Sequence, residues 1–168
     1  MNAGAYLKDI SNILISTQVL DLNDLKIKTF YNKKLNFQYR HSFFQDNDNY
    51  IILSGKFKIE RGNIEEIMNL IVERKQRRVE TQPLEYPSAG SVFRNPLENY
   101  AGKLIENCGL KGYQKGGAEI SKKHANFIVN KENATSEDIK YLMDLAHDTV
   151  KEKYDVDLIR EQELFNWE

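Results

Sequence analysis

The sequence is poor in the residues that build disulfides and metal centres. Of its 168 residues only Cys108 is a cysteine, which excludes an internal disulfide and favours a reducing compartment. Cys108 falls on the apolar face of its predicted helix, so we expect a buried small hydrophobe rather than a nucleophile. His41, His124 and His147 are scattered, and no pair has ligand spacing. We therefore predict no metal site and expect each histidine to be structural or at the surface.

Charge of one sign and long apolar runs are lacking too. The net charge is -1, which argues against a broad nucleic-acid-binding surface. No apolar run approaches membrane-spanning length, and Met1–Tyr6 lacks the basic and apolar regions of a signal peptide. No Gly-x-Ser-x-Gly elbow supports hydrolase chemistry. These absences predict a cytoplasmic protein without nucleic-acid or membrane partners.

The first third of the chain has the two-residue period of β-strands. Apolar and polar side chains alternate over residues 13–19 and 25–29, and Asp-Leu-Asn-Asp at 21–24 predicts a turn between them. Residues 51–59 predict a longer strand, in which Gly55 is a candidate bulge. The pattern indicates a hairpin and a third strand.

A helix is predicted after Asn63, which can cap it, with Glu66 in the capping-box position. Its end, residues 73–78, is basic. Such a cluster could grip phosphate, but a solvated face that suits the helix C-terminus is the commoner case. Residues 81–87 then mark a proline-rich boundary.

The second half predicts a small α+β unit. Helices are expected from Ala101 to Cys108 and from Thr135 or Ser136 onward, with a buried strand at 127–129. The glycine-rich run 111–121 could cradle a phosphate, although its spacing matches no known fingerprint. A final extended run is expected at 156–165. The fold class is therefore α+β.

Three polar residues stand where their neighbours are apolar or constrained. Ser91 lies in the proline-bounded stretch 86–96, which is either a rigid connection or a site, and its hydroxyl could give a proton or satisfy a loop amide. Arg40 lies among aromatics, where it could stack or bind a carboxylate or phosphate. Glu161 follows Arg160, and an exposed pair there would mean little. Spacing alone does not join these residues.

The stretch Pro83-Leu84-Glu85-Tyr86-Pro87-Ser88-Ala89-Gly90-Ser91-Val92-Phe93-Arg94-Asn95-Pro96 resembles the signature of the UDP-N-acetylenolpyruvoylglucosamine reductases (MurB). The resemblance continues, in the family's order, through most of the chain. Its further motifs are Met1–Tyr6, Tyr39–Phe44, Ala101–Glu106, Gly109–Gly112, Gly116–Ser121, His124–Asn130 and Val156–Glu161.

The resemblance implies an oxidoreductase of peptidoglycan precursor synthesis that uses FAD and NADPH. The flavin supplies hydride, and the protein supplies position, charge and a proton. By motif position, the resemblance implies Ser91 as proton donor, Arg40 as the cation that stabilises developing negative charge, and Glu161 as a catalytic glutamate. It further implies substrate contacts, with UDP-N-acetylglucosamine enolpyruvate as the substrate, and flavin contacts. These are Asn95 and Tyr39 for the substrate, and Asn2, Ala3 and Gly4 for the flavin.

The resemblance also implies the domains. Residues 1–82 are expected to be the C-terminal part of a FAD-binding (PCMH-like) α+β domain, and residues 83–168 a substrate-binding domain of the family's shorter branch. The glycine-rich FAD loops of the family have no counterpart here, and the tail after Glu161 departs from its pattern. The alternative is an inactive fragment that binds only the UDP-sugar substrate, or that binds a partner, a separate N-terminal half, which supplies the missing FAD-binding part.

Overall fold

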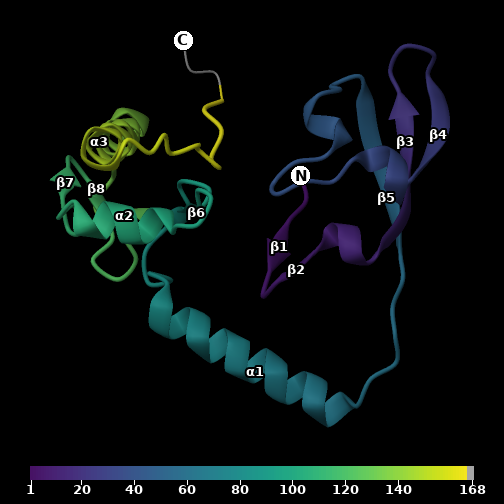
Figure 1. Cartoon of the computed structure of the whole chain (residues 1–168), viewed down its shortest axis with the longest axis horizontal. Coiled ribbons are helices and arrows are strands. Elements are labelled where there is room, and N and C mark those ends of the chain that lie inside the picture. Colours follow the sequence, from purple (N-terminus) through teal and green to yellow (C-terminus); the bar gives the residue numbers. More distant parts are fainter. Residues whose placement is uncertain (166–168) are drawn as a thin grey trace. The chain divides into compact units, whose positions relative to one another are not determined.

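A computed structural model describes residues 1–165 of the chain. It divides into two compact units, which we call unit 1 (Met1–Asn63) and unit 2 (from Ile64 onward) (Figure 1). Helix α1 (Ile64–Thr81) opens unit 2 but buries none of its residues. The family-based boundary after residue 82 stays a prediction, because this helix contributes to neither core. None of the helices within residues 1–165 combines the length and apolar character needed to cross a bilayer.

Unit 1 is organised around a three-stranded antiparallel sheet. Its order is β4 (Lys26–Tyr31), β3 (Leu14–Asp21), β5 (Tyr50–Phe57). The predicted hairpin is confirmed. Its turn is closed because Asp21 Oδ1 accepts a hydrogen bond from the backbone N–H of Asn23 at 2.9 Å.

The predicted bulge at Gly55 is wrong. Gly55 pairs in register with Thr17. The register shift within β5 falls between Ser54 and Ile52, so Leu53 is the extra residue of that strand. A Cβ at Gly55 would lie 3.1 Å from the Phe57 ring. The glycine therefore makes room for an aromatic side chain rather than for an extra residue.

The core of unit 1 is small and aromatic. Val19, Phe30 and Leu35 are its buried members. The partly buried aromatic rings that pack around them are those of Phe37, Phe43, Phe44 and Tyr50. The remaining short elements of the unit are β1 (Gly4–Ala5), β2 (Lys8–Asp9), η1 (Ile10–Asn12), η2 (Asn32–Leu35) and η3 (Phe43–Gln45).

Unit 2 holds a four-stranded antiparallel sheet and two packed helices. The strand order is β6 (Ser88–Ser91), β9 (Phe127–Asn130), β8 (Ala118–Ile120), β7 (Gln114–Lys115). The helices are α2 (Ala101–Asn107) and α3 (Ser136–Tyr154), as the spacing predicted.

Thr135 is the residue that caps α3. Its hydroxyl accepts from Asp138 N–H at 3.1 Å, and the Asp138 carboxylate accepts from Thr135 N–H at 3.0 Å. Ile105 of α2 and Leu142 and Val150 of α3 are at most 1% exposed. Burial of each such side chain stabilises the fold by about 1.5–3 kcal/mol.

Two further predictions concern the glycine-rich run 111–121 and the extended run 156–165. The glycine-rich run forms the β7–β8 hairpin, and a Cβ at Gly117 would overlap the backbone of Glu132. Gly117 therefore permits close packing within the chain, and the phosphate cradle stays a prediction. The extended run expected at 156–165 forms no strand, since its only pairing among the described residues is a single bridge from Arg160 to Phe93.

Candidate active site

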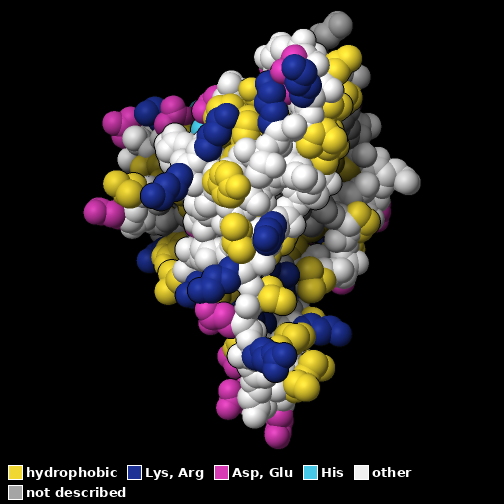
Figure 2. All heavy atoms as spheres, turned by 90° about the vertical axis from the view of Figure 1, so that its right-hand side faces the viewer, with side chains coloured by type: hydrophobic (Ala, Val, Ile, Leu, Met, Phe, Trp, Pro, Cys, Tyr) yellow, Lys and Arg dark blue, Asp and Glu magenta, His cyan; other side chains and the backbone are white. Residues whose placement is uncertain are grey.

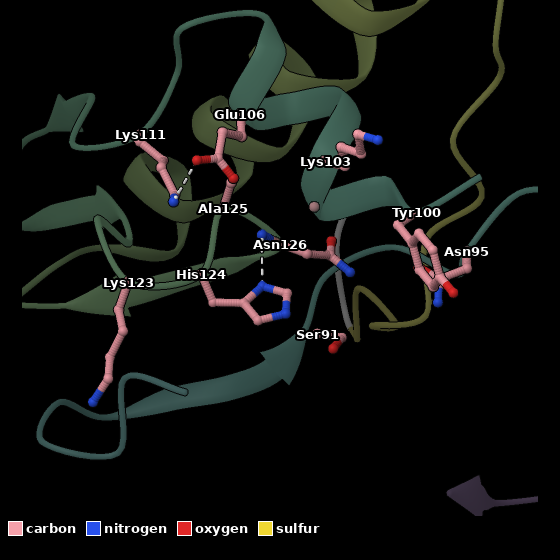
Figure 3. Close-up of a pocket in the computed structure, with 11 residues that line it drawn as sticks. Ser91, Asn95, Tyr100, Lys103, Glu106, Lys111, Lys123, His124, Ala125 and Asn126 are labelled. Carbon is pink, nitrogen blue, oxygen red and sulfur yellow. Dashed lines mark hydrogen bonds and ion pairs between the residues drawn. The ribbon is translucent and has the colours of Figure 1, made fainter. Parts of the chain in front are cut away.

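Ser91 lines a cavity of about 310 Å³ in unit 2 (Figure 3). The wall comes from the end of β6, from α2 with the loop before it, and from the turn before β9. Its members are Ser91, Asn95, Tyr100, Gly102, Lys103, Glu106, Lys111, Lys123, His124, Ala125 and Asn126. Two hydroxyls, two amides, three lysines, a carboxylate and an imidazole thus line one cavity.

Ser91 is held in place by strand pairing. It pairs with Phe127 of β9, and the next residue, Val92, donates its N–H to the backbone oxygen of Asn126 at 2.9 Å. Val92 and Phe93 are both 1% exposed, whereas Ser91 is half-buried. The hydroxyl is therefore carried by a backbone whose following residues are fixed in the core.

The imidazole of His124 lines the cavity. Burial lowers the pKa of His124, and the charge of Lys111 lowers it further. Its Nδ1 accepts the backbone N–H of Asn126 at 3.2 Å, so the proton sits on Nε2. Gly102 permits the close approach of α2, because a Cβ there would lie 3.1 Å from the ring. The imidazole can thus donate a hydrogen bond to a ligand in the cavity.

Three lysines and one glutamate line the cavity, so cations outnumber carboxylates on its wall. Lys111 Nζ lies 2.8 Å from the carboxylate of Glu106, which also lines the wall. Lys123 donates to the backbone oxygen of Val79 at 2.6 Å and lies 3.7 Å from Glu85. Lys103 extends from the exposed side of α2 (Figure 3). Cations in such number suit an anionic ligand such as a phosphate.

Asn95, expected to contact substrate, also supports the helix that forms the wall. Its Oδ1 accepts the N–H of Ala101, the first residue of α2, at 3.2 Å. It lies on the cavity wall as well. The structure therefore brings two predicted site residues, Ser91 and Asn95, to one cavity.

Glu161 lies in unit 2 but does not line the cavity. Its backbone N–H donates to the oxygen of Val92 at 2.8 Å, which places its backbone beside the residue that follows Ser91. The side chain is half-buried. The structure thus brings the Glu161 segment alongside the residues that follow Ser91.

Arg40 and Tyr39 lie in unit 1, at the tip of a tight turn closed by Gln38 and His41. Those two residues exchange backbone hydrogen bonds of 3.0 and 3.2 Å. Arg40 has a φ of 55°, donates to the backbone oxygen of Gly4 at 3.2 Å, and its guanidinium lies 5.2 Å from the centre of the Tyr39 ring. The structural alternative for Arg40, a stacked cation, is thus realised, and the anion-binding role stays a prediction.

The residues expected to contact flavin serve the chain's own backbone. Asn2 is 3% exposed, and its side chain bonds Gln38 and Ser11. At Gly4 a Cβ would lie 2.8 Å from the backbone oxygen of Lys8, so the glycine fits strand β2. Ala3 is exposed. Unit 1, which the structure describes completely, offers no glycine-rich phosphate loop, and the residues present do not by themselves form a FAD site.

Sequence reasoning missed most of the cavity wall. His124 was expected to be structural or at the surface, and the lysines at 103, 111 and 123 were not singled out. One local signal was present: Lys122, Lys123 and His124 are consecutive and precede a buried strand in a chain of net charge -1. Within residues 1–165 no three His, Cys, Asp or Glu side chains gather into a candidate metal site.

The chain is similar to several known proteins. The profile described as UDP-N-acetylenolpyruvoylglucosamine reductase, C-terminal domain, matches residues 82–165. The chain is 47% identical over 161 residues to a UDP-N-acetylenolpyruvoylglucosamine reductase of Caldanaerobacter subterraneus, covering 96% of this chain and 53% of that protein. It is 44% identical over its whole length to the reductase of Bacillus pumilus, covering 55% of it.

A solved structure is also similar. The crystal structure of UDP-N-acetylenolpyruvylglucosamine reductase (MurB) from Thermus caldophilus matches with a TM-score of 0.82 and 31% identity. The match covers 97% of this chain and 57% of that one. The chain therefore spans about half the length of the curated relatives it matches.

Proposed function

The chain belongs to the family of UDP-N-acetylenolpyruvoylglucosamine reductases, and we propose that it is the substrate-binding portion of such an oxidoreductase. The substrate would be UDP-N-acetylglucosamine enolpyruvate, whose enol ether is reduced on the way to peptidoglycan. This reaction would make the chain a participant in cell wall biogenesis. The α+β architecture matches that of the solved relative.

One observation carries the proposal: Ser91 lines the same cavity as Lys103, Lys111, Lys123 and His124. A UDP-sugar contains a diphosphate, which binds cations and N–H donors. The cavity wall provides both kinds of group. The substrate carbon that becomes carbanion-like needs a proton, and the Ser91 hydroxyl is the group placed to give one. A serine hydroxyl is a weak acid, so it acts only where neighbours favour proton loss in the transition state.

The remaining catalytic roles are part of the same proposal. Arg40 would stabilise negative charge that develops on the substrate carboxylate, and its rigid turn and stacking on Tyr39 keep the guanidinium ordered. Tyr39 is 56% exposed, so its ring is accessible to substrate. Glu161 would complete the set, and its backbone bond to Val92 supports a place near Ser91.

FAD and NADPH belong to the proposal for the whole reductase. FAD, reduced by NADPH, would supply the hydride. Because unit 1 does not form a FAD site alone, we assign the flavin's binding mainly to the portion of the family fold beyond this chain. Asn2, Ala3 and Gly4 would then contribute backbone beside it. A single half-buried cysteine and a nucleotide-sugar substrate support a cytoplasmic location.

We further propose that the part of the family fold that this chain does not span covers one face of the sheet in unit 1. Leu20 of β3 pairs with Ile27 of β4 and with Ile51 of β5, which makes an apolar row across all three strands. Ile27 is 64% exposed and Ile51 is 49% exposed. Figure 2 looks onto the side where these strands lie and shows hydrophobic side chains among lysines and arginines. The relatives carry roughly as much chain again, which is enough to cover this row.

The substrate assignment is tested by isothermal titration calorimetry. The purified chain is titrated with UDP-N-acetylglucosamine enolpyruvate, with UDP, and with enolpyruvate-free UDP-N-acetylglucosamine. We expect the first to bind most tightly, because it alone offers both the diphosphate and the enolpyruvyl carboxylate. Absence of binding by all three would refute a substrate site in this cavity.

The catalytic assignment is tested in an assembly that holds flavin. The absorbance spectrum after addition of FAD, with and without the N-terminal half of a relative, shows where the flavin binds. In the flavin-containing form, Ser91→Ala should leave flavin reduction by NADPH unchanged and block substrate reduction. Equal slowing of both half-reactions would contradict the role of Ser91 as proton donor.

A further inference from the structure

The two residues that flank Glu161 fasten its segment to two different elements of unit 2. Arg160 lies 2.7 Å from the carboxylate of Asp144 on α3. On the other side, Gln162 Nε2 donates to the carbonyl oxygen of Gly90 at 3.1 Å. Glu161 therefore lies between an anchor on α3 and an anchor on the residue before Ser91.

Gly90 sits at an irregularity in β6. Ser88 pairs with Val129 and Ser91 pairs with Phe127, so three steps along β6 oppose two along β9. Gly90 has a φ of +82°, a conformation that glycine adopts without strain. A bulge takes a residue out of the regular ladder of hydrogen bonds. The side chain of Gln162 supplies a donor at this interruption.

The hydrogen bond from Gln162 to Gly90 extends a short backbone pairing between residues 159–161 and residues 92–94 toward Ser91. Arg94 N–H donates to Ile159 O at 2.9 Å, and Glu161 N–H donates to Val92 O at 2.8 Å. Figure 1 shows the segment after α3 running back toward β6. Because the two segments run antiparallel, the next contact along the pair falls at Gly90, where Gln162 makes it with its side chain.

We propose that Gln162 is a positioning residue for the reaction assigned above. Its amide holds the Gly90–Ser91 peptide so that the hydroxyl of Ser91 stays on the cavity wall, and it ties that peptide to Glu161. The inference rests on the proposed function of Ser91. Glutamine suits the task because its amide is a neutral donor. A carboxylate of the same length would set an acceptor against the Gly90 carbonyl.

The first test is a double-mutant cycle read by the affinity of the full-length chain for UDP-N-acetylglucosamine enolpyruvate. Gln162→Met keeps the length of the side chain and removes the donor. We expect it to weaken binding about 2- to 10-fold, the worth of one neutral hydrogen bond. Glu163→Gln, a change at the exposed neighbour, is the matched control and should bind like the wild type.

The decisive measurement of the cycle is the effect of Gln162→Met on affinity in the Ser91→Ala variant. If Gln162 acts through Ser91, then Gln162→Met has no further effect on affinity once the hydroxyl is gone. An effect of full size in that background, or unchanged binding by Gln162→Met alone, overturns the positioning role and leaves the proposed function standing. A wild-type chain that binds no substrate overturns both.

The second test needs no substrate and uses a variant that keeps the shape of the side chain. In Gln162→Glu the protonated carboxyl can donate to Gly90, and the ionised form cannot. The ¹³C chemical shift of the Gly90 carbonyl should therefore titrate with pH in this variant and stay flat in the wild type and in Glu163→Gln. A Gly90 carbonyl that ignores the titration would rule out the contact on which the inference depends.

Discussion

The side chain of Asn126 exchanges two hydrogen bonds with the backbone of Phe93. Its Nδ2 donates to the Phe93 carbonyl at 2.8 Å, and its Oδ1 accepts the Phe93 N–H at 3.0 Å. Both residues are at most 3% exposed. The amide thus completes the pairing of the strand that carries Ser91, at a point where no backbone partner does so.

Asn126→Ala should destabilise unit 2 strongly. It leaves one buried donor and one buried acceptor on Phe93 without partners, and each such group costs about 1–3 kcal/mol. We expect a loss of about 2–5 kcal/mol in the free energy of unfolding, measured by urea denaturation. Asn107→Ala on the exposed end of α2 is the control and should change stability by about 0.5 kcal/mol or less. Equal effects of the two changes would show that the amide clamp is unimportant.

Under the proposed function, Lys103→Ala should weaken binding of the UDP-sugar and make that binding less sensitive to salt. The lysine lines the cavity, and removal of one cation from a diphosphate site typically costs a few-fold to roughly 10-fold in affinity, less at high ionic strength. Calorimetric titrations at low and high salt measure both effects. Lys151→Ala on the exposed face of α3, where the lysine pairs with Asp155, serves as the matched control. A decrease of the same size in that control would point to net charge rather than to the cavity.

The stabilising contribution of His147 to unit 2 should decrease as the pH rises above about 6.5. Hydrogen bonds to Asp148 and then to Asp157 raise the pKa of His147 above its usual 6.5. A raised pKa in the folded state contributes stability that is complete below the unfolded pKa and is lost as the pH rises through the folded pKa. His147→Asn should remove this component, and Glu152→Gln on the same helix should keep it. The free energy of unfolding measured across neutral pH distinguishes them, and an unchanged slope in His147→Asn would refute the assignment.

The contribution of His124 to the stability of unit 2 should depend on pH in the opposite sense. Burial lowers the pKa of His124 below the usual 6.5, so the neutral ring favours the folded state. Its contribution is present above about pH 6.5 and is lost as the pH falls toward the folded pKa. His124→Phe keeps the ring contact with Phe127, whose centre lies 4.9 Å away, and should remove the loss on the acid side. Persistence of the same acid-side loss in this variant would assign it to another group.

Local pattern was enough for the longer helices and strands. The alternation over 13–19 and 25–29 predicted β3 and β4, and the apolar spacing after Ala101 and Thr135 predicted α2 and α3. These elements depend on neighbours a few residues apart, so period and capping chemistry specify them. The bulge was misplaced because it depends on which residues of β3 oppose β5. A glycine alone does not reveal that register.

The sequence by itself determined the family, through the proline-bounded motif with Ser91, and it determined the candidate chemistry of single residues. The tertiary structure decided which of these residues lie together in one cavity. Ser91 meets Lys103 and His124 because β6, α2 and the turn before β9 converge on one cavity, and Gln162 reaches Gly90 across 72 positions of chain. Such contacts follow from packing of the sheet and helices as a whole. Propensity and spacing act only over a few residues, so no local pattern encodes them.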